Sequence, residues 1–341
     1  MKSDPIKFDA AFLIDVNNPI GLRSFLNANR HFEEGEKIEK LETAGEGNMN
    51  VVVRVITDRR SFIVKQSRPW VNKYPSVKAP ADRILIEHEF YQTVQNNPIM
   101  QKFMPHIYCF DPSNFIMCIE DFGKANDFSS IYRKGVEMSK KDMADVSSFI
   151  SELHFAFKDP QQESRIVNME MRKLNHEHIF VLPLLQHNGF DLDGVLNGLQ
   201  DATHRFRTDD KLKACARELG DVYLSDSGSR LLHGDYYPGS WLSTSSGFKM
   251  IDPEFCFTGR PEFELGVTIA HLKMAQQPDS LIKDLFVYYH FDGRFDGSLM
   301  SKFAGMEMIR RLIGLAQLPL ELSLEERLEL LDTAYDLVVN G

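Results

Sequence analysis

The order of strand-like and helix-like segments constrains the fold of this chain more than any other feature. Within residues 38–66, two short β-branched runs at 51–56 and 61–65 follow a glycine-containing turn at 45–48, and a polar turn separates them. Short runs of this kind, bounded by turn residues, predict strands joined by tight connections. We therefore expect a three-stranded antiparallel meander near the N-terminus.

The rest of the chain changes from strand-like to helical character. A helical pattern is expected at 82–94, and a buried strand at 115–123 ends at a glycine. From about residue 124 onward the periodicity is helical, except at 230–257, where three short strands are expected. Strands first and helices afterwards predict an α+β fold with a β-rich N-lobe and a mostly helical C-lobe. We place the two domains at residues 1–122 and 123–341.

Charge and composition exclude some partners. The 341 residues include 43% hydrophobic and 26% charged residues, which is typical of a folded protein that buries a large core. The formal net charge is −10 and the basic residues are dispersed, so no basic stripe is available to neutralise a nucleic-acid backbone. We expect no nucleic-acid partner. The sequence leaves open whether the chain acts alone or as a homodimer.

The N-terminal segment and the cysteines both indicate a cytoplasmic protein. The first sixteen residues, MKSDPIKFDAAFLIDV, carry acidic residues where a signal peptide needs an apolar run, and no stretch is long and apolar enough for a membrane span. Cys109, Cys118, Cys215 and Cys256 form no C-x-x-C pair and stand beside hydrophobic residues. We therefore expect four reduced, buried thiols and no membrane association.

The N-terminal meander carries two features that suit a phosphate group. Gly45 and Gly47 would let backbone N–H groups approach an anion, although such a turn is also an ordinary hairpin. Lys65 ends an apolar strand, where a lysine is either solvated or, in a kinase-like lobe, directed at nucleotide phosphates and held by a helix glutamate. The helix at 82–94 supplies Glu87 and Glu89. No Walker-type phosphate loop is present.

The segment LLHGDYYPGSWL (231–242) and the following IDPEF (251–255) hold the carboxylates that suit catalysis. Phosphoryl transfer needs a carboxylate that accepts the proton of the nucleophile, together with oxygen ligands for Mg²⁺. Asp235 would supply the first, and Asp252 and Glu254 the second. The alternative, water-facing turn carboxylates, is less favourable because each follows a buried apolar run, where an unpaired charge is costly.

These motifs resemble those of the aminoglycoside and choline kinase-like phosphotransferase superfamily, and within it the methylthioribose kinases. The matching segments are GEGNMNVVVRV, IVKQSRPWV, HGD followed by Ser240, IDPEF, and the arginine pair in EMIRRLIGLA; they occur in family order from about residue 41 to 316. The resemblance implies a bilobal protein-kinase-like fold, use of ATP and Mg²⁺, and transfer of a phosphoryl group to a hydroxyl of a small metabolite.

The resemblance also implies a role for each matching residue. Asp235 would be the catalytic base, and Ser240, Asp252 and Glu254 would bind the metal. The nucleotide site would include Gly45, Gly47, Asn48, Lys65 with its ion-pair partner Glu87, and Glu120, Asp121 and Phe122 beside the adenine. Arg310, Arg311 and Tyr237 would contact the substrate.

Departures from the family pattern leave the acceptor open. The family sequence H-G-D-L-H is HGDYY here, so Tyr237 replaces a histidine, and FTGRPEFELG introduces Arg260 and Glu262 and replaces an aspartate by Glu264. A methylthioribose-like sugar is the first acceptor to consider. An amino alcohol, an aminoglycoside or a fructosamine is the alternative, which twin arginines disfavour by repelling a cation. A third reading is a kinase-like protein that binds nucleotide without catalysis.

Overall fold

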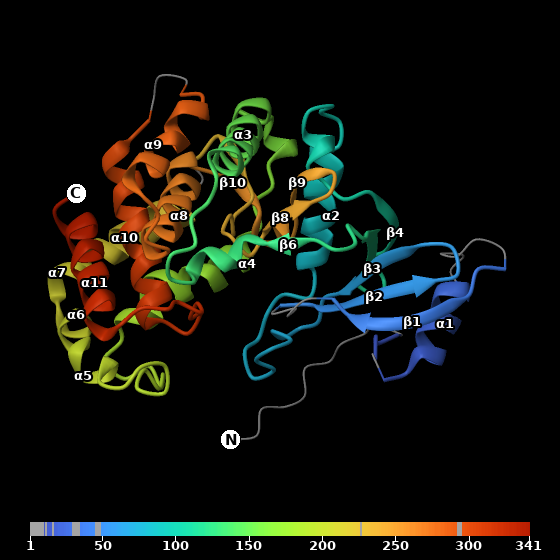
Figure 1. Cartoon of the computed structure of the whole chain (residues 1–341), viewed down its shortest axis with the longest axis horizontal. Coiled ribbons are helices and arrows are strands. Elements are labelled where there is room, and N and C mark those ends of the chain that lie inside the picture. The colour runs from blue at the N-terminus through green and yellow to red at the C-terminus, as the bar shows by residue number, and fades with distance from the viewer. Residues whose placement is uncertain are drawn as a thin grey trace. The chain divides into compact units, whose positions relative to one another are not determined.

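The computed structural model describes residues 10, 12–15, 17–28, 35–44, 49–225, 227–291 and 295–341. The chain divides into two compact units, Met1–Ala125 and Asn126–Gly341 (Figure 1). The expected α+β fold is confirmed, because the sheet of five strands lies in the first unit and most helices lie in the second. Within the described ranges, no helix combines the length and the apolar character needed to cross a bilayer.

The first unit is built on one antiparallel sheet with the strand order β1-β2-β3-β5-β4. The strands are β1 (Ile38–Thr43), β2 (Val51–Thr57), β3 (Ser61–Gln66), β4 (Ile107–Asp111) and β5 (Ile116–Glu120), and the helices are α1 (Pro19–Ala28) and α2 (Arg83–Val94). The first three strands pair consecutively, so the predicted meander is confirmed. Strand β4 was not expected from the sequence.

Side-chain alternation gives the sheet two different faces. Phe62 and Val64 of β3 are buried in a hydrophobic core together with Leu22 and Leu26 of α1. Because successive side chains of a strand point to opposite faces, Lys65 lies on the other face. Helix α2 supplies the partner of Lys65 there, as described below. The sheet therefore keeps one face for packing and presents a charged group on the other.

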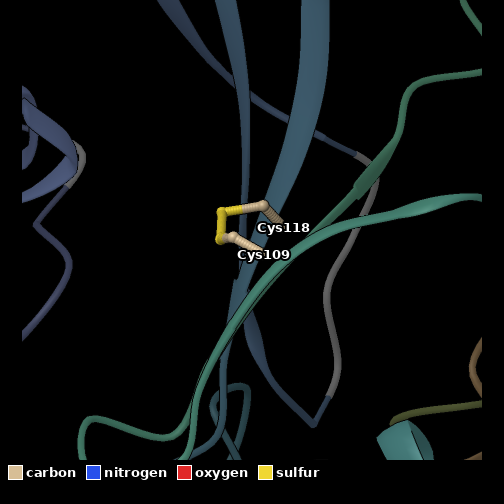
Figure 2. Close-up of a disulfide and its surroundings, with 2 residues drawn as sticks. All are labelled: Cys109 and Cys118. Atoms are coloured by element: carbon tan, nitrogen blue, oxygen red, sulfur yellow. A yellow bond between two sulfur atoms is a disulfide. The ribbon is translucent and has the colours of Figure 1, made fainter. Parts of the chain in front are cut away.

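The prediction of four reduced thiols is wrong for two of the cysteines. Cys109 on β4 and Cys118 on β5 are direct partners in the antiparallel pairing, and their sulfur atoms form a disulfide (Figure 2). Both residues are buried. The sequence does not reveal this contact, because only the register of the two strands places the cysteines opposite each other.

The second unit is mainly helical and also contains short strands, three of which the sequence predicted. Its longer helices are α3 (Lys140–Ala156), α4 (Met169–His176), α7 (Asp210–Leu224), α8 (Pro261–Met274), α9 (Asp279–Tyr288), α10 (Gly297–Ile313) and α11 (Leu324–Val339), and its short ones are α5 (Leu199–Ala202) and α6 (His204–Thr208). The strands are β6 (Asn126–Asp127), β7 (Arg230–Leu232), β8 (Trp241–Thr244), β9 (Gly247–Met250) and β10 (Phe257–Gly259). They form the sheets β10-β7 and β6-β8-β9.

Helix α8 lies in the interior of the second unit, and α10 packs against it (Figure 1). Almost every residue of α8 is buried, which agrees with its apolar composition on all sides. At Gly266 a Cβ would lie only 2.7 Å from the carbonyl oxygen of Met300, so the glycine permits close approach of the two helices. This packing determines where the polar residues of α8 and α10 meet the loop after β7.

Candidate active site

The loop that follows β7 presents the Asp235 side chain. β7 ends at Leu232 and pairs with β10, and this pairing sets the point where the loop begins. Gly234 has a φ of +85°, and a Cβ there would lie 2.0 Å from the carbonyl oxygen of Phe255. Only glycine fits both the conformation and the space. The next side chain, that of Asp235, remains 23% exposed, so a ligand can reach its carboxylate.

Glu264 in the first turn of α8 holds this loop through the backbone. Its Oε1 accepts a hydrogen bond from Gly234 N at 2.7 Å, and its Oε2 accepts one from His233 N at 3.2 Å. His154 of α3 bonds the same Oε2 through Nε2 at 2.9 Å, and its Nδ1 meets the Tyr289 hydroxyl at 2.8 Å. Glu264 is only 1% exposed. Sequence reasoning noted this glutamate only as a departure, although a carboxylate in an apolar helix was a signal of a bonding role.

Arg311 of α10 reaches the Asp235 carboxylate. Its Nη2 donates to Asp235 Oδ1 at 3.4 Å, and its guanidinium carbon lies 4.9 Å from the centroid of the Tyr237 ring. Arg310 and Arg311 are both buried, so neither belongs to a solvated helix surface. The fold therefore brings Arg311 to Asp235 and Tyr237, although Arg311 lies 76 positions after Asp235 in the sequence.

A carboxylate that sequence reasoning missed, Glu307, binds both arginines. Its Oε2 accepts from Arg310 Nη1 at 3.0 Å and its Oε1 from Arg311 Nε at 2.6 Å. Burial acts to raise the pKa of Glu307, but the charges of the two arginines and a hydrogen bond from His271 outweigh it and hold this pKa well below its usual value. The signal in the sequence was a glutamate one helical turn before the arginine pair.

His271 of α8 continues this network. Burial lowers its pKa to about 4, so the ring is neutral near pH 7. Its Nε2 lies 3.2 Å from Glu307 Oε1, and its Nδ1 lies 2.6 Å from the Tyr132 hydroxyl. Because an ionised carboxylate only accepts, Nε2 carries the proton and Nδ1 accepts from Tyr132. A continuous chain of hydrogen bonds thus runs from Tyr132 through His271 and Glu307 to Arg311.

The two tyrosines of HGDYY have different environments. Tyr236 is 1% exposed, donates to the carbonyl oxygen of Val146 at 2.7 Å and stacks on Phe149, so it is a core residue. Tyr237 lies beside Arg311 and 5.3 Å from the His271 ring, measured between centroids. Only the second tyrosine can therefore influence a ligand at Asp235.

The other departures form contacts within the second unit. Arg260 Nε donates to the hydroxyl of Ser227 at 3.1 Å, and Glu262 Oε1 accepts from the backbone N–H of Asp296 at 3.1 Å. Both side chains thus tie neighbouring segments together.

Of the residues expected to bind a metal, Ser240 contacts the loop after β7 directly. Ser240 Oγ donates to the Asp235 carbonyl oxygen at 3.1 Å, and Ile251 N donates to the Ser240 carbonyl oxygen at 3.2 Å. Asp252, whose φ is 63°, directly follows Ile251 in the sequence. Glu254 is buried. One hydroxyl and two carboxylates are oxygen ligands of the kind that Mg²⁺ prefers. The described residues nevertheless contain no cluster of three or more His, Cys, Asp or Glu side chains that could hold a metal ion.

In the first unit, Lys65 and Glu87 form a buried ion pair. Lys65 Nζ lies 2.6 Å from Glu87 Oε1, and the two side chains are 2% and 0% exposed. This is the pairing that the resemblance implied. Arg83 of α2 is also fully buried; its Nε donates to Asn50 Oδ1 at 3.0 Å and its Nη2 to the Met49 carbonyl oxygen at 2.8 Å. Arg83, which sequence reasoning missed, therefore fixes the start of β2.

The remaining nucleotide-site predictions fall into two groups. Gly45, Gly47 and Asn48 lie outside the described residues. Glu120, Asp121 and Phe122 are half-buried at the end of β5. Glu120 accepts from His106 N at 3.1 Å, and Asp121 accepts from Arg54 at 2.9 and 3.0 Å, so both carboxylates already have partners in their own unit.

Comparison with known sequences identifies relatives with a common chemistry. Residues 169–298, all in the second unit, match the family model described as the phosphotransferase enzyme family. The chain is 28% identical over 335 residues to a methylthioribose kinase of Geobacillus sp. (strain WCH70), covering 84% of this chain and 80% of that protein.

Solved structures with the same fold have much lower sequence identity. Choline kinase LicA from Streptococcus pneumoniae matches with a TM-score of 0.53 at 12% identity and covers 94% of this chain and 98% of its own. The ADP-bound aminoglycoside phosphotransferase APH(2'')-Ib matches with a TM-score of 0.51 at 13% identity and covers 93% and 99%. At these identities the likeness is evidence of the fold alone.

Proposed function

We propose that this chain, which is similar in sequence to the phosphotransferase enzyme family and to methylthioribose kinase, transfers the γ-phosphoryl group of ATP to a hydroxyl of a methylthioribose-like sugar. The observation that carries the proposal is the position of Asp235, on a loop held by Glu264 and within reach of a ligand. A carboxylate fixed in this way is suited to accept a proton from a hydroxyl nucleophile.

The residues divide into groups with separate tasks. Asp235 orients the acceptor hydroxyl and takes its proton. Lys65, held by Glu87, neutralises charge on the nucleotide phosphates, and the end of β5 borders the adenine. Ser240, Asp252 and Glu254 would hold Mg²⁺, which supplies charge stabilisation on the transferring group when bound. Positioning and electrostatics provide most of the acceleration in phosphoryl transfer, and both depend on how firmly these groups are held.

The charge balance around Asp235 favours a neutral acceptor. The positive charges of Arg310 and Arg311 are matched by the carboxylates of Glu307 and Asp235. Neither an anionic nor a cationic acceptor would find an excess of opposite charge there, whereas sugar hydroxyls need only hydrogen bonds. This balance and the similarity to methylthioribose kinase support a sugar over an amino alcohol or aminoglycoside.

Steady-state assays of ADP release test this function. The panel contains methylthioribose, ribose, choline, ethanolamine and an aminoglycoside, each with Mg·ATP. We expect turnover with methylthioribose or a related sugar, and we expect Asp235→Ala to abolish turnover while Mg·ATP still raises Tm. Turnover by Asp235→Ala equal to that of the wild type would exclude this base.

Two further properties belong to the same proposal. We propose a cytoplasmic location, because the reaction needs a supply of ATP. A homodimer would be detected by light scattering at micromolar protein concentration. Loss of the metal or base carboxylates would have indicated a protein that binds nucleotide without catalysis, but Asp235, Asp252 and Glu254 are all present.

A further inference from the structure

The arginine pair on α10 is not a pair of equivalent groups. Arg311 donates to Asp235, binds Glu307 through Nε at 2.6 Å and covers the Tyr237 ring. Arg310 bonds only Glu307 among these residues, and its buried Nε has no hydrogen-bond partner within the described part of the chain. Arg311 is therefore the arginine whose contacts are directed at the proposed base.

The orientation of the Asp235 carboxylate depends on Arg311. Within the ranges that the structure describes, Arg311 donates the one hydrogen bond that this carboxylate accepts. At 3.4 Å the bond is long, so small displacements of the guanidinium would break it. The side chain of Arg311 must consequently be held by something else if it is to keep Asp235 in one rotamer.

Glu307 and His271 provide this support. Glu307 is 1% exposed and binds Arg311 at 2.6 Å, and His271 is completely buried and bonds Glu307 on one side and Tyr132 on the other. Residues from α8, α10 and the 3-10 helix η2 (Phe128–Tyr132) thus form one series of hydrogen bonds that ends at the guanidinium of Arg311. The direction of each hydrogen bond in this series is fixed, because the Glu307 carboxylate only accepts and the arginine only donates.

We propose that Glu307 and His271 are positioning residues for the transfer reaction, which hold Arg311 against Asp235 so that the base keeps one orientation toward the acceptor hydroxyl. The proposal rests on the function proposed above. It predicts that loss of either residue slows the chemical step, because a displacement of about 1 Å in a reacting group can cost about 100-fold in rate. Nucleotide binding, which involves other residues, should be unaffected.

The test compares kcat and KM of full-length variants. Glu307→Gln keeps the shape of the side chain but removes its charge, and we expect kcat to fall about 100-fold while KM for ATP changes less than about twofold. His271→Leu should lower kcat at least about tenfold, and His271→Gln should recover much of it, because the amide retains a donor near the Nε2 position. Rescue by glutamine separates positioning from simple filling of space.

A matched control is Glu36→Gln in the first unit. Glu36 is a buried carboxylate that also binds an arginine, Arg60, at 3.0 Å and accepts from the Thr57 hydroxyl at 2.8 Å. The Glu36→Gln substitution should lower Tm without lowering kcat. A crystal structure of Glu307→Gln provides a readout independent of turnover, and we expect the contact between Arg311 and Asp235 to be absent from it.

Several results would overturn the proposal. It fails if Glu307→Gln keeps the kcat of the wild type, if only KM for the acceptor rises, or if the contact between Arg311 and Asp235 persists in the crystal. Equal losses of kcat in Glu307→Gln and Glu36→Gln would show general destabilisation. Wild-type protein without turnover on any acceptor, or an active Asp235→Ala variant, would instead refute the proposed function and this inference with it.

Discussion

Replacement of Glu264 by glutamine should release the loop that carries Asp235. The carboxylate accepts from His233 N and Gly234 N and contacts His154 Nε2. Glutamine keeps one acceptor oxygen but turns an NH₂ donor toward the other N–H group, so at least one buried backbone donor loses its partner. An unsatisfied buried donor costs about 1–3 kcal/mol, and hydrogen bonds to a charged group contribute a similar amount.

We therefore expect the free energy of unfolding to fall by about 3 kcal/mol. For a domain of this size class, that corresponds to a decrease in Tm of roughly 6–12 °C. The displaced Asp235 should also lower kcat about 100-fold. Differential scanning calorimetry measures the first effect, and ADP release with the best acceptor of the panel measures the second.

Glu262→Gln is the matched stability control. Glu262 is also buried in the first turn of α8, but among the residues that the structure describes it accepts one backbone hydrogen bond, from Asp296 N, which a glutamine oxygen can still accept. The free energy of unfolding of Glu262→Gln should be lower than that of the wild type by less than about 1 kcal/mol. If Glu264→Gln shows the same small decrease in Tm and normal turnover, Glu264 does not hold the loop and the reasoning is refuted.

Three other perturbations have defined outcomes. Lys65→Met should lower Tm, because Glu87 loses a buried partner and breaking such a pair costs about 3–5 kcal/mol. Turnover should fall as well, and a normal kcat in ADP-release assays would contradict the role of Lys65. Gly234→Ala should give little soluble protein, since the new Cβ would meet the Phe255 carbonyl oxygen at 2.0 Å, and wild-type yield and Tm would argue against the loop conformation. Burial lowers the pKa of His271 from 6.5 in the unfolded chain to about 4 in the folded protein. As pH falls below 6.5, the unfolded chain therefore binds a proton that the folded protein does not. We expect the free energy of unfolding to decrease by about 3 kcal/mol between pH 6.5 and 4. Urea unfolding between pH 4 and 7 should show this loss in the wild type and a smaller one in His271→Gln; identical slopes would refute the assignment.

Local pattern in the sequence was sufficient for much of the fold. The meander of β1, β2 and β3, helix α2 and the three strands around the HGD loop all follow from short-range alternation, helical periodicity and turn residues. The candidate base was also visible, because Asp235 directly follows a buried apolar run and a glycine. These features depend on residues close together in the chain.

The supports of the candidate site depended instead on tertiary packing. Glu264 reaches His233 across 31 positions, and Arg311 reaches Asp235 across 76. The disulfide between Cys109 and Cys118 likewise required the register of two strands. A sequence shows which residues can ionise or donate, but the partner of a buried charge is set by the way helices and strands pack. For this chain the sequence by itself indicated the kind of chemistry, and only the fold decided which side chains hold the candidate base, Asp235, in place.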